Sequence, residues 1–286
     1  MMSNPIFSAI DKATEIFDKA GIETSRLDAE ILLAHTLGIE RSELYFSTTS
    51  LPQEKLSQFQ KYCERRKLRE PISYITGVKE FWSIPIKVTR DVLIPRPETE
   101  LLIETVLKKF PTKNESFFIL DLGGGSGCIC AALAKEYPNS LLTLMDVSKR
   151  ALDIASENLT FVKKRIEFIE CDILGELPIK TKFDLIVSNP PYIPTKDFDS
   201  LSDDVREYEP ELALLAGEDG LIYFRRLIDI AKMHLKNGGY LIFEIGFDQH
   251  ESIKKLLYEN SIFSDIEFSK DLAGIERSVA VRWKNS

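Results

Sequence analysis

The sequence predicts an α/β protein in which a mostly parallel sheet follows a small bundle of helices. Up to about residue 75, apolar residues recur every three to four positions, which is the spacing of one helix face. From residue 98 onward, short apolar strands alternate with helical segments, as in right-handed βαβ units. Between these parts the pattern has a period of two, which indicates strands. We therefore expect a helical domain over 1–75, a β-hairpin connector over 76–97 and a sheet domain over 98–286.

The composition is that of a globular protein with an acidic balance of charge. Of the 286 residues, 44% are hydrophobic and 29% are charged, which suffices for a core. No apolar run approaches the roughly 20 residues that span a bilayer, and the N-terminus lacks the apolar stretch of a secretory signal. The net charge of −8 disfavours a protein that coats nucleic acid, because such a protein neutralises phosphates with Lys and Arg. We expect a cytoplasmic monomer with no membrane contact and no direct nucleic-acid substrate.

Cysteine and histidine usage predicts a reduced protein that holds no metal. The histidines are isolated from one another in the sequence, so a zinc site has little to use. The cysteines form no CxxC pair and no paired framework, which favours buried, inert thiols in a reducing cytosol. These cysteines are Cys63, Cys128, Cys130 and Cys171.

The helical part contains three predicted helices. The first covers 6–17 and is stopped by Gly21, as a glycine after a helix end would do. The second starts at a capping-box-like stretch, Ser25–Asp28, in which Asp replaces the usual Glu. The third covers 54–68 behind Pro52, a residue that suits a helix N-terminus. It ends in a basic run that we interpret either as a solvated helix face or as a docking surface: Arg65, Arg66, Lys67 and Arg69.

The connector and the sheet domain follow from alternating and buried apolar segments. In the connector, 81–88 and 92–94 are predicted strands of a hairpin that turns at Arg90 and Asp91, and Pro85 limits the first to an edge. The later strands are predicted at 117–121, 141–146, 166–170, 183–188 and 240–245, with two more near residues 266 and 279. The helices are predicted at 100–110, 127–137, 151–162, 221–235 and 249–259. Ligands of such sheets bind at the carboxyl ends of strands, where the strand order reverses.

A glycine-rich loop, Asp121–Gly127, follows the first strand of the sheet domain and opens a helix. Glycines let the backbone approach a ligand closely, and a helix N-terminus offers unpaired N–H groups. A dinucleotide fingerprint does not fit, because Cys128 or Cys130 stands where G-x-G-x-x-G/A needs its last small residue. Asp146 ends the next strand about 20 residues later, where a carboxylate can accept ribose hydroxyls. Asp172, after the third strand, would lie at the adenine edge. A tight turn without ligand and simple helix capping are the alternatives for the loop and the two carboxylates.

A second motif, Asn189–Tyr192, reads Asn-Pro-Pro-Tyr and follows a buried strand directly. The two prolines fix φ and remove donors, which leaves the Asn189 side chain and the Pro190 carbonyl as acceptors. Two acceptors can take both hydrogens of a substrate –NH₂ and so aim the lone pair of its nitrogen. Tyr192 offers an apolar face to a planar amide or base. The alternative is a strand terminator without a ligand.

Taken together, these segments resemble the peptide chain release factor glutamine methyltransferase family (PrmC/HemK). Asn-Pro-Pro-Tyr behind a glycine loop and a ribose Asp is typical of methyltransferases that act on planar nitrogens. I-P-R-P-E-T-E at 94–100 is far more specific. Further matching segments stand at 28–35, 69–77, 81–82, 209–214, 217–221 and 271–277. The resemblance covers essentially the whole chain.

The resemblance implies a Rossmann-like SAM-dependent methyltransferase domain with a seven-stranded mostly parallel sheet, preceded by a small N-terminal helical bundle and a β-hairpin connector. The implied reaction is methyl transfer from S-adenosylmethionine (SAM) to the side-chain amide nitrogen (N5) of the glutamine in the Gly-Gly-Gln motif of class 1 release factors. S-adenosylhomocysteine is the product, and the helical domain recognises the protein substrate.

The resemblance and the strand-end positions together predict the residues of both sites. The cofactor residues are Gly123, Gly124, Gly125, Ser126, Gly127, Asp146, Asp172, Ile173 and Asn189. The substrate residues are Asn189, Pro190, Pro191, Tyr192, Leu93 and Ile94, of which Asn189, Pro190 and Tyr192 are the catalytic ones. Many relatives carry Thr in place of Gly124, and some carry an aromatic in place of Ile173, where plain apolar contact with adenine is expected instead of stacking.

Two other function classes stay open at this point. An adenine-N6 methyltransferase on DNA or RNA could use the same Asn-Pro-Pro-Tyr site, but the acidic charge and the lack of a groove-reading module disfavour it. A non-catalytic SAM-sensing adaptor would have no need for an aimed pair of acceptors. Methyl transfer to release factor, to nucleic acid or to neither separates the three.

Overall fold

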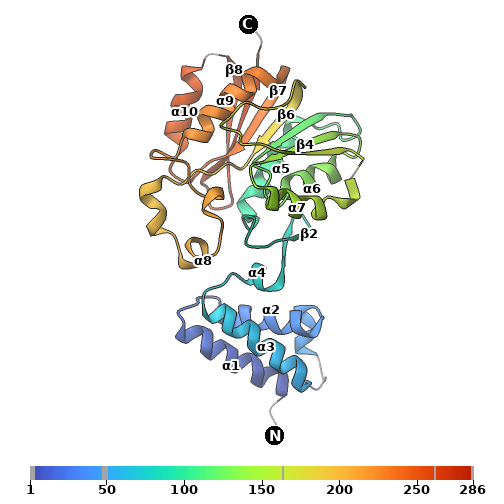
Figure 1. The fold of residues 1–286 in the computed structure, drawn as a ribbon, viewed down its shortest axis with the longest axis vertical. Helices are drawn as coiled ribbons and strands as arrows, with labels where there is room; N and C mark the ends of the chain where they lie inside the picture. The colour runs from blue at the N-terminus through green and yellow to red at the C-terminus, as the bar shows by residue number, and fades with distance from the viewer. Residues whose placement is uncertain (1–3, 47–50, 163, 261, 285–286) are drawn as a thin grey trace. The chain divides into compact units, whose positions relative to one another are not determined.

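The computed structural model describes residues 4–46, 51–162, 164–260 and 262–284. The chain divides into two compact units (Figure 1), which we call the helical unit and the sheet unit. The helical unit comprises 1–78 together with 202–208, and the sheet unit comprises 79–201 and 209–286. The segment 202–208 is thus part of the helical unit although it lies far along the chain, and no sequence pattern indicated this.

The helical unit packs its helices around one apolar core. Its elements are α1 (Pro5–Lys19), α2 (Ser25–Leu37), η1 (Arg41–Tyr45), α3 (Gln53–Lys67), α4 (Ile72–Thr76) and, from the later segment, α8 (Asp203–Arg206). Phe17, Leu32 and Phe59 are buried in the core, one from each long helix. Gly21 follows the C-cap of α1 with φ +69°, so the predicted glycine stop is confirmed.

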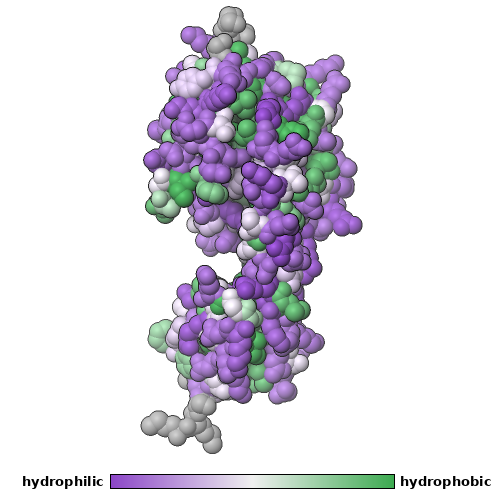
Figure 2. All heavy atoms as spheres, turned by 90° about the vertical axis from the view of Figure 1, so that its left-hand side faces the viewer, coloured by the Kyte–Doolittle hydropathy of each residue, from purple (hydrophilic) through white to green (hydrophobic). Residues whose placement is uncertain are grey.

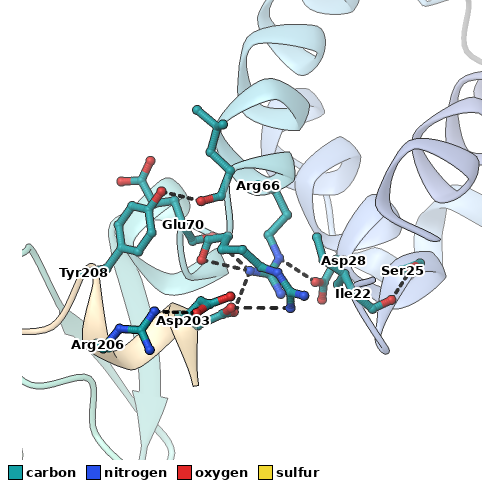
Figure 3. Close-up of polar contacts among 11 residues, drawn as sticks. Ile22, Ser25, Asp28, Arg66, Glu70, Asp203, Arg206 and Tyr208 are labelled. Atoms are coloured by element: carbon teal, nitrogen blue, oxygen red, sulfur yellow. Dashed lines mark hydrogen bonds and ion pairs between the residues drawn. The ribbon is translucent and has the colours of Figure 1, made fainter. Parts of the chain in front are cut away.

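The predicted capping box at the start of α2 is wrong. Ser25 is the first helical residue rather than the cap, and its hydroxyl donates to the Ile22 carbonyl. Asp28 lies on the buried side of the helix and accepts from Arg66 Nε at 2.8 Å (Figure 3). The box fails because a buried guanidinium on another helix is a stronger partner for this carboxylate than a backbone N–H.

The basic run at the end of α3 forms ion pairs inside the helical unit. Besides Asp28, the Arg66 guanidinium binds Asp204 of α8 at 2.7 Å. Arg65 binds Glu70 through two hydrogen bonds of 2.8 Å each. Arg66 itself is buried. The run is therefore not a plain solvated face, since two of its arginines hold the unit together.

Replacing Arg66 with alanine should lower the free energy of unfolding of the helical unit by about 3 kcal/mol, because it leaves the buried Asp28 carboxylate without its partner. Urea titration followed by circular dichroism measures this. Lys67→Ala on the same helix is the control, since its pair with Glu64 is exposed and 3.5 Å long and contributes at most about 0.5 kcal/mol. An equal loss in both variants would contradict the structural role of Arg66.

The hairpin lies earlier in the chain than the sequence predicted. It consists of β1 (Val78–Phe81) and β2 (Ile84–Lys87), joined at Trp82 and Ser83, which both have φ +54°. The predicted second strand at 92–94 is not a strand. The apolar run of that segment misled the prediction, because Val92 and Leu93 line a cavity that is described below.

The sheet unit contains the predicted seven-stranded, mostly parallel sheet. The strand order is β5-β4-β3-β6-β7-β9-β8, in which β9 runs antiparallel to both of its neighbours. The strands are β3 (Phe118–Leu122), β4 (Leu141–Asp146), β5 (Ile166–Glu170), β6 (Phe183–Ser188), β7 (Leu235–Glu244), β8 (Phe263–Lys270) and β9 (Glu276–Trp283). The helices are α5 (Glu100–Lys109), α6 (Cys128–Glu136), α7 (Lys149–Asn158), α9 (Ile222–His234) and α10 (His250–Glu259). Short 3₁₀ turns are η2 (Pro97–Thr99), η3 (Thr160–Val162), η4 (Thr195–Ser200) and η5 (Glu211–Ala213).

The order of the strands determines where a ligand can bind. From β3 the chain builds outward through β4 to β5, and then returns to the other side of β3 with β6 and β7. The order therefore reverses between β3 and β6, the position at which open α/β sheets bind their ligands. The glycine loop leaves β3 and the Asn-Pro-Pro-Tyr motif leaves β6, so the two predicted motifs lie at this point.

No helix in the part of the chain that the structure describes is long and apolar enough to cross a membrane. Figure 2 shows a largely hydrophilic surface on the visible face of each unit, with apolar residues in scattered groups.

Candidate active site

A cavity of about 320 Å³ lies at the carboxyl ends of the central strands of the sheet unit. Eight of the residues predicted from the sequence line it: Leu93, Gly123, Gly125, Asp146, Asp172, Ile173, Asn189 and Pro191. The predicted cofactor and substrate residues thus meet in one space. Six predicted residues do not line it: Ile94, Gly124, Ser126, Gly127, Pro190 and Tyr192.

The glycine loop presents alternate residues to the cavity. Gly123 and Gly125 have φ of +71° and +53°, and a Cβ at either position would meet no protein atom within 4 Å. Gly124 instead faces the sheet, where a Cβ would collide with the Leu144 side chain. Its backbone N–H donates to the Met145 carbonyl at 3.0 Å, which fixes the loop against β4. In this chain Gly124 therefore packs against Leu144 and does not line the cavity.

Asp146 holds the loop and the start of the next helix at the same time. Its Oδ2 accepts from Gly125 N and its Oδ1 accepts from Ser148 N, both at 2.8 Å. Burial raises the pKa of this carboxyl, and the hydrogen bonds from the backbone oppose that rise. Each oxygen keeps a lone pair that can accept a hydroxyl of a ligand. The capping and ligand interpretations of Asp146 are therefore compatible.

Two further carboxylates near the loop, those of Asp172 and Asp121, differ in their exposure to solvent. Asp172 is exposed, accepts from Leu174 N at 2.9 Å and lines the cavity. Asp121 at the end of β3 is fully buried, and neither of its oxygens has a hydrogen-bond partner among the described residues. Burial raises the pKa of Asp121 to about 7, and the neighbouring Cys130 partly offsets this rise. Asp121 lies behind the loop and does not line the cavity.

The Asn-Pro-Pro-Tyr motif contributes its residues unevenly. Asn189 Nδ2 donates to Thr99 Oγ1 at 3.0 Å, and no described residue donates to Asn189 Oδ1 or to the Pro190 carbonyl. These two oxygens remain as the predicted acceptors. Tyr192 packs against the apolar core, and its carbonyl accepts from Gln249 Nε2 at 3.0 Å. Burial raises the pKa of the Tyr192 phenol well above its usual value.

Part of the cavity wall was not predicted from the sequence. Pro210, Leu212 and Ala213 line it, as does Tyr223 from α9. Glu209, the residue before this stretch, accepts from Ile94 N at 3.2 Å and from Arg96 at 2.5 Å, so it ties the two segments together. The segment 209–214 could have been predicted as part of the site, since it matched the family pattern. No sequence feature indicated Tyr223.

The prediction of four buried thiols is wrong for one residue. Cys63, Cys128 and Cys130 are buried, and burial raises the pKa of Cys63 and of Cys128 to about 12. Cys171 is partly exposed and lines the cavity, because it follows β5 at the same edge of the sheet as the other site residues. Within the described ranges, no three His, Cys, Asp or Glu residues are grouped to hold a metal ion.

Comparisons with known proteins match most of the chain. The family described as PrmC N-terminal domain matches residues 8–77, and the family described as methyltransferase small domain matches residues 97–202. The release factor glutamine methyltransferase of Rhodopirellula baltica is 40% identical over 97% of this chain and 96% of its own length. That of Coxiella burnetii is 42% identical over 91% of this chain and 92% of its own.

A solved structure supports the fold. The methyltransferase from Pyrococcus furiosus has a TM-score of 0.50 and 17% identity, and the alignment covers 73% of this chain and 92% of that one. At this identity the likeness concerns the fold alone. The relatives, by contrast, match in sequence over nearly their full length. The chain belongs to the release factor glutamine methyltransferase family.

Proposed function

We propose that this protein transfers a methyl group from SAM to the side-chain amide nitrogen (N5) of the glutamine in the Gly-Gly-Gln motif of class 1 peptide chain release factors. Full-length relatives named release factor glutamine methyltransferases support this reaction. The observation in the structure that carries it is the position of Asn189, whose Oδ1 has no donor among the described residues and whose side chain lines the cavity.

The residues of the cavity fit a nucleoside with a methionine-like tail. Gly123 and Gly125 leave open space where a side chain would otherwise stand, and Asp146 has acceptors for ribose hydroxyls. Ile173 and Asp172 would bind the adenine through apolar contact and a hydrogen bond. When bound, SAM supplies an electrophilic methyl group on a sulfonium.

The amide nitrogen of glutamine is a weak nucleophile because its lone pair is delocalised into the carbonyl group. Asn189 Oδ1 and the Pro190 carbonyl would accept its two hydrogens, which favours electron density on nitrogen and fixes the direction of its lone pair. Orientation of two reactants at near-attack distance can supply up to about 7–11 kcal/mol. No strong base is required before the transfer, since the nitrogen can lose its proton afterwards.

The helical part, residues 1–75, would recognise the release factor, while the sheet domain performs the transfer. Its match to the PrmC N-terminal domain supports this division of labour. We further propose that the protein acts in the cytoplasm as a monomer, with a protein rather than a nucleic acid as substrate, in accordance with its net charge of −8.

Radiolabelled SAM tests this function against its alternatives. Purified release factor, DNA and RNA are offered in separate reactions. We expect label on the release factor only. Label on nucleic acid alone would favour the adenine-N6 methyltransferase, and label on neither would favour a SAM-sensing adaptor. Either of these results contradicts the proposal.

A further inference from the structure

The hydroxyl group of Thr99 lies between two polar side chains of the site. Thr99 ends η2 and runs directly into α5 with helical backbone angles of φ −65° and ψ −21°, and its side chain makes no capping hydrogen bond. Its Oγ1 lies instead 2.6 Å from Glu244 Oε2 and 3.0 Å from Asn189 Nδ2. Thr99 and Glu244 are each 2% exposed. A buried hydroxyl at the start of α5 therefore connects Glu244, the last residue of β7, with Asn189, the residue that follows β6.

The sheet brings Asn189 and Glu244 together. Strands β6 and β7 are parallel neighbours, and Ser188 pairs with Phe243. Asn189 follows the last residue of β6 and Glu244 is the last residue of β7, so the two lie at the carboxyl ends of neighbouring strands. The segment before α5 delivers Thr99 to this edge, where the ion pair of Arg96 with Glu209 holds it.

The chemistry of these three groups sets the direction of both hydrogen bonds. A threonine hydroxyl has one hydrogen to donate, and an ionised carboxylate can only accept. Thr99 therefore donates to Glu244 and must accept from Asn189, and only the NH₂ of the asparagine can donate. The Oδ1 atom of Asn189 is consequently turned away from Thr99. The opposite rotamer would place Oδ1 against an oxygen that has no hydrogen to share.

The direction of these hydrogen bonds requires the ionised form of Glu244, which predominates above the pKa of its carboxyl group. Burial raises the pKa of Glu244 to about 7. The hydrogen bond from Thr99 and the positive charges of Arg277 and Arg96 oppose this rise, while Glu98 adds to it. Above pH 7 the carboxylate is therefore ionised, and the experiment below is performed at pH 8.

We propose that Thr99 and Glu244 are positioning residues that orient the Asn189 amide, so that the site accepts the –NH₂ of glutamine and rejects the carboxylate of glutamate. This inference rests on the proposed function and adds the origin of its specificity. Glutamate would present only lone pairs to Asn189 Oδ1 and to the Pro190 carbonyl. An asparagine released from Thr99 could turn its NH₂ toward the cavity and accommodate that carboxylate.

The test uses three threonine variants of the full-length protein at pH 8. Thr99→Val keeps the shape of the side chain and removes the hydroxyl, whereas Thr99→Ser keeps the hydroxyl. Thr105→Val is the matched control, because Thr105 is a buried threonine of the same helix whose hydroxyl binds Leu101 and Ser278 instead. For each variant we measure kcat on the release factor, its KM, the Kd for SAM, and inhibition by a release factor that carries Gly-Gly-Glu.

We expect Thr99→Val to lower kcat about tenfold, and to reduce the preference for Gly-Gly-Gln over Gly-Gly-Glu by a similar factor, the value of one oriented hydrogen bond. The Kd for SAM should not change, and Thr99→Ser and Thr105→Val should behave like the wild type. If Thr99→Val does not bind SAM, and so has not folded, Thr99→Ala takes its place.

Loss of kcat with an unchanged glutamine preference would show a merely structural role for Thr99 and would overturn the inference. Unchanged kcat and preference would overturn it equally. Both results leave the proposed function intact, because the wild type still methylates glutamine. Absence of methylation by the wild type would overturn the proposed function itself, and this inference with it.

Discussion

Replacing Asn189 with alanine should lower kcat on the release factor about 1,000-fold, because it removes an oriented hydrogen-bonding group from the reacting nitrogen. Binding of SAM should be retained, since the glycine loop and Asp146 remain in place. Single-turnover methylation with saturating SAM measures the loss, and calorimetry measures the affinity for SAM.

Asn139→Ala is the control for this variant. Asn139 is also an asparagine in a loop of the sheet unit, but it is exposed and its side chain donates only to the Asn114 carbonyl. Near-normal turnover of Asn189→Ala with full binding of SAM would remove Asn189 from the mechanism.

Replacing Asp146 with alanine should raise the Kd for SAM about 100-fold, the combined effect of two hydrogen bonds from ribose hydroxyls to a charged acceptor. The loss includes the support that Asp146 Oδ2 gives to Gly125 N at 2.8 Å. Calorimetry measures the affinity, and kcat at saturating SAM should fall far less than the affinity does.

Asp153→Ala on the following helix is the matched control, since this carboxylate is exposed and forms an ion pair with Lys149. An unchanged Kd in Asp146→Ala would contradict the assignment of Asp146 to the ribose. The same Kd increase in both variants would show an effect of net charge rather than of a specific contact.

Elements with a strong local pattern were predicted well from the sequence. The bounds of β4, β5 and β6 match the prediction, because each is a short, largely apolar segment that ends at a polar residue. The hairpin was misplaced because its turn begins at Trp82, a bulky residue type that rarely adopts a positive φ such as the +54° it has here. The capping box at Ser25 failed because the partner of Asp28 lies 38 residues away on another helix.

The residues of the candidate site show the same difference: those in local motifs were predicted, and those placed by contacts between distant segments were not. Gly125, Asp146 and Asn189 were found because each belongs to a motif whose spacing carries a physical meaning. Thr99 lies in the family segment 94–100, but no local pattern predicted its contact with Asn189, which is 90 residues away in the chain. Tyr223 enters the cavity through the packing of α9, which no local pattern encodes. Contacts between distant segments were thus the part that the sequence alone could not supply.

Mass spectrometry of a release factor incubated with this protein and SAM tests the central claim most directly. Digestion isolates the Gly-Gly-Gln peptide, and fragmentation locates any added methyl group. We predict a single methyl group on the side-chain nitrogen of that glutamine, absent when Asn189→Ala replaces the wild type. An unmodified glutamine, or a methyl group on another residue of the release factor, would contradict the account.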